Sequence, residues 1–130
     1  MRVLLLLLTA FFCATGYAAE DRYDCTIERG YSLGPSGLKR NRRVLSSIES
    51  MTFEIDRVTG AVTDSILENL SSQATVIAPG DTDNSFQVYW IVRGRAGSRV
   101  RFIEVQEFVD GPQKPFRAIV QNWTYTGHCE

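Results

Sequence analysis

Hydrophobic and polar residues alternate along much of the chain with a repeat of two, which is typical of β-strands. The stretches with this pattern, bounded by residues that favour turns, are 23–29, 51–64, 73–78, 86–93, 99–109 and 115–126. Short connections make consecutive strands antiparallel neighbours, because a parallel crossover needs about a dozen residues or more. The pattern therefore predicts an all-β fold, an antiparallel meander of about six to eight strands that forms a small barrel or sandwich with one or two short helices.

Residues 51–64 give the clearest local prediction, a β-hairpin. Met51, Phe53 and Ile55 alternate with polar residues, and the chain then turns and returns. Gly60 is free to adopt a positive φ where the turn rejoins the second strand.

Three other segments have weaker patterns. Residues 30–41 are rich in glycine and end in basic residues, so they are interpreted as a loop. Apolar residues at 44–51 have a helical spacing, and a capping box that begins at Ser65 predicts a short helix at 66–71.

The hairpin around residues 94–98 carries the candidate binding site. A three-residue loop, Arg95-Ala96-Gly97, with Gly97 in the left-handed conformation, suits these residues. It would place Arg93 opposite Arg99. One face would then carry Tyr89, Ile91, Arg93, Arg95, Arg99 and Arg101, and the core face would carry Phe86, Val88, Trp90, Val92, Val100, Phe102, Glu104, Gln106 and Phe108.

Like charges directly opposite each other destabilise a sheet, so these arginines need an explanation. They are either a solvated edge that prevents aggregation or a site for an anion. The anion could belong to a phosphorylated lipid head group, an acidic glycan or an acidic protein surface; single-stranded nucleic acid is a weaker candidate. The candidate ligand-binding residues are Tyr89, Arg93, Arg95, Arg99 and Arg101.

Glu104 and Gln106 fall on the predicted core face, where an unpaired carboxylate is costly. Either the face opens to solvent, or an arginine of a neighbouring strand pairs with Glu104. The other possibility is a partly polar cavity that holds a small ligand.

The first residues indicate export. Arg2, an apolar run and small residues before Ala18 predict a signal peptide at 1–18, followed by a single β-domain at 19–130. A membrane anchor would need about 20 apolar residues, and this run is interrupted earlier. We expect a periplasmic or extracellular protein.

Two cysteines, Cys25 and Cys129, belong to the predicted mature domain. Disulfides persist in exported proteins, so we expect these residues to be bonded. A redox or metal pair would need CxxC spacing or nearby ligands, which the cysteines lack. The formal net charge of −1 argues against binding a polyanion through net charge, but it leaves room for a local basic patch.

Catalytic motifs are not recognisable in the sequence. The single histidine, His128, adjoins Cys129 at the end of the chain, and there is no nucleophile elbow, HExxH motif or phosphate-binding loop. We therefore expect no cofactor and no metal. The sequence favours a non-enzymatic binding module; the alternatives are a structural or envelope-associated interaction domain and a hydrolase or isomerase with a carboxylate site. Glycosylation sequons begin at Asn69 and Asn122.

Overall fold

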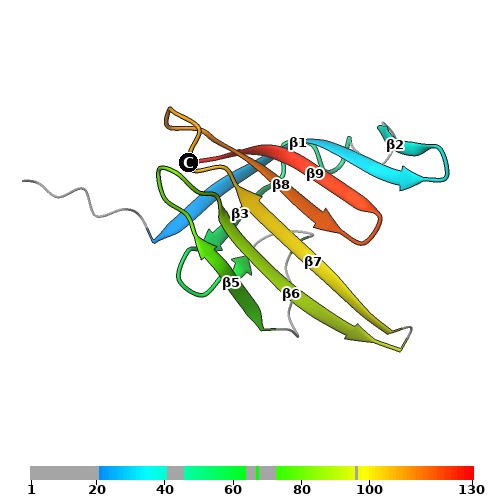
Figure 1. Ribbon diagram of the computed structural model, residues 1–130. Helices are drawn as coiled ribbons and strands as arrows, with labels where there is room; N and C mark the ends of the chain where they lie inside the picture. Colours follow the sequence, from blue (N-terminus) through cyan, green and yellow to red (C-terminus); the bar gives the residue numbers. More distant parts are fainter. Residues whose placement is uncertain (1–20, 41–45, 64–66, 68–72, 96) are drawn as a thin grey trace, which may run out of the picture.

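The computed structural model describes residues 21–40, 46–63, 67, 73–95 and 97–130. The described residues contain nine β-strands, labelled in Figure 1. Their bounds are β1 (Arg22–Gly34), β2 (Gly37–Arg40), β3 (Thr52–Asp56), β4 (Val62–Thr63), β5 (Ala74–Pro79), β6 (Phe86–Gly94), β7 (Gly97–Val105), β8 (Lys114–Val120) and β9 (Trp123–Cys129).

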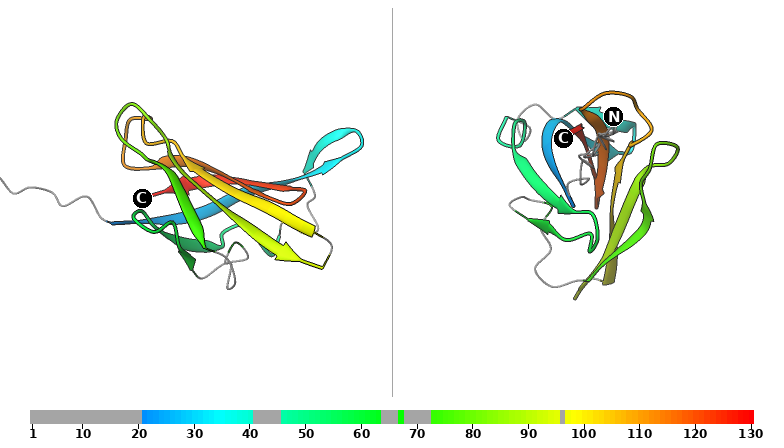
Figure 2. Two further views of the ribbon diagram at one scale, coloured as in Figure 1. Left: turned by 60° about the horizontal axis from the view of Figure 1, so that its bottom comes forward. Right: turned by 90° about the vertical axis from the view of Figure 1, so that its left-hand side faces the viewer.

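The strands form one antiparallel sheet that curls into a half-barrel (Figures 1 and 2). Their hydrogen-bonded order is β4-β3-β1-β9-β8-β7-β6-β5, and β2 pairs with β1 beside this path. Strands β5 to β9 are therefore a meander, and the short connections from β5 to β8 predict this part of it. The predicted all-β, antiparallel fold is confirmed, and β4 and β5 lie at the two ends of the sheet order.

The predicted loop at 30–41 is instead a hairpin. Strand β1 continues to Gly34, and β2 returns beside it with Leu33 directly opposite Leu38. Glycine lowers strand propensity, so the composition of this segment indicated a loop although its backbone can pair. We call residues 31–40 the β1–β2 arm.

The predicted single strand at 115–126 is two strands, β8 and β9. Gln121 adopts a φ of 58° between them, a left-handed conformation that is uncommon outside glycine. No glycine or proline marks this turn, so the sequence pattern runs through it. The sequon residue Asn122 lies in the exposed turn rather than within a strand.

No helix occurs within the residues that the structure describes. Residues 46–50 form a turn, so the helical spacing at 44–51 does not produce a helix there. The helix predicted at 66–71 lies outside the described residues apart from Leu67, as do the predicted signal peptide and the sequon residue Asn69.

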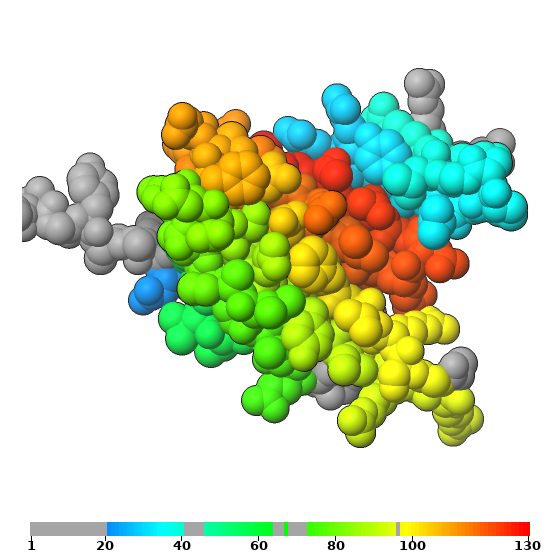
Figure 3. All heavy atoms as spheres, viewed as in Figure 1, coloured from blue at the N-terminus to red at the C-terminus, as the bar shows by residue number. Residues whose placement is uncertain are grey.

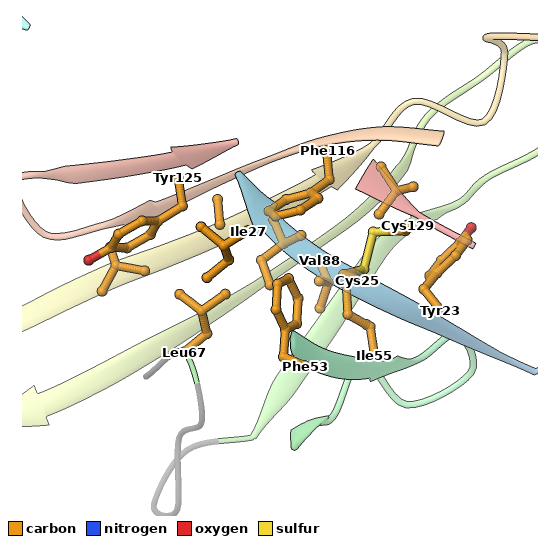
Figure 4. Close-up of a cluster of buried hydrophobic side chains, with 14 of the residues drawn as sticks. Tyr23, Cys25, Ile27, Phe53, Ile55, Leu67, Val88, Phe116, Tyr125 and Cys129 are labelled. Atoms are coloured by element: carbon orange, nitrogen blue, oxygen red, sulfur yellow. A yellow bond between two sulfur atoms is a disulfide. The ribbon is translucent and has the colours of Figure 1, made fainter. Parts of the chain in front are cut away.

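Alternate side chains of the strands point into the half-barrel and form one core (Figure 4). Each fully buried large apolar side chain contributes roughly 1.5–3 kcal/mol through the hydrophobic effect. Phe53 and Phe116 meet edge to face, with ring centroids 5.2 Å apart. The most fully enclosed side chains are Phe53, Phe86, Ile27, Ile55, Leu67, Ile103, Val88, Val105, Cys25 and Cys129.

A disulfide joins Cys25 of β1 to Cys129 of β9, as predicted. The two residues are directly opposite each other, and both are buried (Figure 4). The disulfide therefore joins the first described strand to the last at the centre of the sheet order, where β1 lies between β3 and β9.

The β3–β4 hairpin has the predicted turn. The Asp56 carboxylate accepts hydrogen bonds from the backbone N–H groups of Thr59 and Val58, at 2.7 and 2.9 Å. The hydrogen bonds from Thr59 lower the pKa of Asp56 below its usual range. Gly60 has a φ of +72°, as predicted. A Cβ atom on Gly60 would lie 2.4 Å from Cγ2 of Val88, so the turn packs closely against β6.

Replacing Gly60 with alanine is expected to lower the free energy of unfolding by about 2 kcal/mol, through left-handed strain and displacement of Val88. Urea unfolding measures the loss. Gly111→Ala is the control, because Gly111 also has a positive φ but an added Cβ atom there would have no other atom within 4 Å. A Gly60→Ala variant no less stable than Gly111→Ala would contradict the close packing.

Candidate functional site

The β6–β7 hairpin is the predicted site, and its register differs from the prediction by one residue. Gly94 pairs with Gly97 and Arg93 pairs with Ser98, so two residues rather than three connect the strands. Side chains alternate between faces, so a one-residue shift exchanges the two faces of β7. The predicted pairing of Arg93 with Arg99 is wrong.

The arginines of this hairpin consequently lie on both faces of the sheet. Arg99 is opposite Val92, and Arg101 is opposite the buried Trp90, so both are on the inner face. Arg101 donates a hydrogen bond to the carbonyl oxygen of Leu67, at 3.3 Å. Arg93 is on the outer face, which also carries Tyr89 and Ile91. The predicted single arginine face is therefore wrong.

The same one-residue shift changes which side chains of β7 are buried in the core. Ile103 and Val105 are buried in place of the predicted Val100, Phe102, Glu104, Gln106 and Phe108. Glu104 lies on the outer face, where Arg117 of β8 pairs with it at 2.6 Å and Gln87 donates a hydrogen bond at 3.2 Å. An arginine of a neighbouring strand thus satisfies this carboxylate, which was one of the predicted possibilities.

The candidate arginines nevertheless gather at one end of the half-barrel. The β6–β7 turn, the β8–β9 turn and the β1–β2 arm all lie at this end (Figures 1 and 2). We define the basic end as residues 31–40, 91–101 and 120–123, which include six basic residues and no acidic residue. The basic residues are Lys39, Arg40, Arg93, Arg95, Arg99 and Arg101.

The opposite end carries the opposite charge. We call it the acidic end; it consists of the strand ends and loops at 21–24, 54–57, 79–85, 106–114 and 130, with nine acidic and three basic residues. Its acidic residues are Asp21, Asp24, Glu54, Asp56, Asp81, Asp83, Glu107, Asp110 and Glu130. A chain of almost no net charge is therefore strongly polarised along the barrel, and such a field orients approaching partners.

Three arginines of the basic end are available to a ligand. Arg93, Arg95 and Arg99 are exposed, and none of them forms an ion pair with a residue that the structure describes. Arg40, by contrast, pairs with Glu49 at 2.8 Å. The unpaired guanidinium groups are strong donors for phosphate or carboxylate oxygens.

A hollow of about 320 Å³ lies at the tip of the β6–β7 hairpin. Arg95 and Arg99 line it together with Gln121 from the β8–β9 turn, and Val92 and the two hairpin glycines complete it. Two cationic groups beside an amide can bind an anion through charge and directed hydrogen bonds.

Two other hollows are less suited to an anion. One of about 420 Å³ lies between the β3–β4 hairpin and strands β5 and β6, and the described residues that line it are uncharged. Trp90 lines this hollow; its indole N–H is buried and has no acceptor among the described residues. The other, of about 350 Å³, is at the acidic end and is lined by Asp24, Glu54 and Glu130.

A connected polar cluster at the acidic end has a structural role. The Tyr23 hydroxyl donates a hydrogen bond to the Glu107 carboxylate, which also pairs with Arg57 at 3.3 Å. Burial raises the pKa of Tyr23, and the hydrogen bond to Glu107 raises it further. Arg57 also lies over the Tyr23 ring, 4.7 Å from its centroid. These contacts tie β1, the β3–β4 turn and the β7–β8 loop together.

No known protein family, curated protein or solved structure matches this chain. Within the described residues, no helix is long and apolar enough to cross a membrane. The same residues contain no group of three His, Cys, Asp or Glu side chains arranged to hold a metal ion.

The sequence prediction missed Lys39 and Arg40 as part of the site. The sequence pattern places these residues among the basic residues that end a loop at 30–41, far along the chain from Arg93. A signal was present: Leu33 and Leu38 flank Gly34-Pro35-Ser36-Gly37 symmetrically, a pattern that suits a hairpin. The half-barrel then brings this hairpin to the same end as β6–β7.

Proposed function

We propose that this protein is an exported, non-enzymatic binding module that holds an anionic partner at its basic end. The observation that carries the proposal is the separation of charge among the described residues: six basic residues at one end, of which Arg40 pairs with Glu49, and nine acidic and three basic residues at the other. Such a distribution accelerates the encounter with an anion and selects one orientation of the protein.

The hollow at the β6–β7 tip supports this proposal. It joins Arg95 and Arg99, which have no described ion-pair partner, to the polar side chain of Gln121. Arg99 belongs to strand β7, so its guanidinium group starts from a hydrogen-bonded strand. A non-enzymatic role agrees with the polar cluster around Glu107, whose groups bind one another and connect three segments.

Retention on immobilised heparin, a polyanion, tests the proposal. The parent is expected to elute at a distinctly higher salt concentration than Arg93→Gln/Arg95→Gln, because each lost contact reduces counterion release. The control is Arg22→Gln/Arg29→Gln, which changes the net charge equally but lies outside the residues of the basic end. The control is expected to elute close to the parent.

Equal elution of the two double variants would show that only net charge matters and would overturn the proposal. Failure of the parent to bind heparin at low salt would do the same. All four arginines are at least partly exposed, and circular dichroism should show the same fold for each variant.

A protein-interaction domain is the second candidate function, and a row of apolar side chains on the outer face favours it. Tyr89 of β6, Phe102 of β7 and Ile119 of β8 are directly opposite one another across three strands. Beside them, Ile91 pairs with Val100, and both are exposed. A partner bound through this face would stay bound at high salt, whereas a partner bound at the basic end would be released.

A further inference from the structure

The β1–β2 arm projects from the half-barrel and has an apolar pair near its tip. Strand β2 pairs only with β1, and Leu33 and Leu38 are directly opposite each other. Each is 60 % exposed. In Figure 3 the arm (cyan) and the β6–β7 hairpin (yellow-green to yellow) form two separate projections on the same side of the molecule.

Basic residues lie next to this apolar pair. Lys39 follows Leu38 on β2 and is on the other face of the arm, while Arg40 is on the face of the leucines and pairs with Glu49. The β6–β7 hairpin, with Arg93 and Arg95, is at the same end of the half-barrel. Apolar side chains beside Lys and Arg are typical of segments that lie in the interface of an anionic membrane, where the apolar groups leave water and the cations meet phosphate.

We infer that the anionic partner is a membrane surface. Leu33 and Leu38 enter the head-group region, Lys39, Arg93 and Arg95 contact lipid phosphates, and the acidic end points away. This inference rests on the proposed function and names its ligand class. Repulsion between the acidic end and anionic lipid excludes the reverse orientation.

The shape of the arm favours a membrane over an acidic protein or a glycan. A specific protein interface buries about 1,200 Å² or more, which needs a broad surface, whereas β2 has four residues and the arm is narrow. Leu33 and Leu38 at the projecting tip have no planar ring on which a sugar could stack, and the aromatic residues Tyr31 and Trp123 lie nearer the base of the arm. A lipid surface accepts a narrow apolar tip, because the bilayer adapts to it and the basic residues around it remain at the phosphates.

Co-sedimentation with vesicles tests the inference. The parent is expected to bind vesicles of phosphatidylcholine with phosphatidylglycerol, and to bind vesicles of phosphatidylcholine alone far less. Leu33→Ser/Leu38→Ser is expected to weaken binding to the anionic vesicles about tenfold or more, since two inserted apolar groups are lost. The matched control is Val58→Ser/Phe108→Ser, which removes two exposed apolar side chains, one in the acidic end and one directly beside it. This control should bind as the parent does.

A direct measure of insertion uses tryptophan with brominated lipid as a quencher. The added fluorescence of Leu38→Trp should be quenched on anionic brominated vesicles, and that of Val58→Trp should not. The native Trp90 and Trp123 supply the same background in both variants.

The outcomes separate this inference from the proposed function. If the parent is retained on heparin but does not bind anionic vesicles, the membrane inference is wrong and the proposed function stands, with an acidic protein or glycan as the partner. If Leu33→Ser/Leu38→Ser binds anionic vesicles as tightly as the parent, the arm does not insert and the inference is wrong, while binding through the basic end stands. If Leu38→Trp is not quenched while vesicle binding persists, the arm does not insert and the inference is also wrong. If the parent binds neither heparin nor anionic vesicles, both proposals fail.

Discussion

Replacing Gly127 with alanine is expected to lower the free energy of unfolding by about 3 kcal/mol or more, at the upper end of the cost of overpacking. A Cβ atom at this position would lie 1.9 Å from the carbonyl oxygen of Thr26 and 2.8 Å from a ring carbon of Phe116. A backbone oxygen cannot rotate away as a side chain can. The methyl group must therefore separate β9 from β1, where the ladder already contains an irregularity between Ile27 and Arg29.

Urea unfolding measures this effect as a fall in the midpoint. Gly94→Ala is the matched control, since Gly94 also belongs to a strand pair without a positive φ, and the nearest atom to an added Cβ would be 3.8 Å away. The control should change the stability by less than about 1 kcal/mol, the usual size of a surface substitution. Equal midpoints for Gly127→Ala and the parent would contradict the close approach of β1 and β9.

Removing the disulfide is expected to destabilise the domain by roughly 3–4 kcal/mol. Cys25 and Cys129 are 104 residues apart in the sequence, and closing a loop of that length restricts the unfolded chain by up to about 4.7 kcal/mol. Both cysteines are buried, so two serine hydroxyls in their place would also lose hydrogen bonds to water. A domain of this size has a total stability of about 5–15 kcal/mol, so the loss is a large fraction of it.

Two measurements check the disulfide. Alkylation of the protein unfolded in urea without reductant should leave Cys25 and Cys129 unmodified by mass spectrometry, and alkylation after reduction should modify both. Cys25→Ala/Cys129→Ala, which avoids the buried hydroxyls, should unfold at a much lower urea concentration than the oxidised parent and close to the reduced parent. Two alkylated cysteines before reduction would contradict the bond.

Local signals in the sequence were sufficient for the class of fold. The alternation of residues 51–56 predicted β3, and Gly60 marked the turn after it, because both depend on residues adjacent in the chain. The pairing of Cys25 with Cys129 followed from the number of cysteines in the predicted mature domain. Short connections from β5 to β8 likewise determined that these strands are antiparallel neighbours, whereas the turn between β8 and β9 had no such signal.

The ends of the strands and the register of their pairing were harder to predict from the sequence. Arg95, Ala96 and Gly97 are compatible with a two-residue or a three-residue connection, and the choice decides which face of β7 is buried. Ile103 and Val105 favour one register, while Val100 and Phe102 favour the other, so alternation alone does not select it. Packing selects it: Ile103 and Val105 are fully enclosed in the core, and Glu104 meets Arg117 of β8 on the outer face.

The amino-acid sequence by itself determined the β-strand class, the Gly60 turn, the disulfide pair and the presence of a basic hairpin, because each depends on neighbouring residues or on residue type. Only the tertiary structure decided that β1 lies between β9 and β3, and that the β1–β2 arm therefore reaches the same end as the β6–β7 hairpin. It also placed the arginines on both faces of the sheet, although they lie at one end of the half-barrel. Sheet order and register depend on contacts between residues far apart in the chain, which the burial of a common core selects.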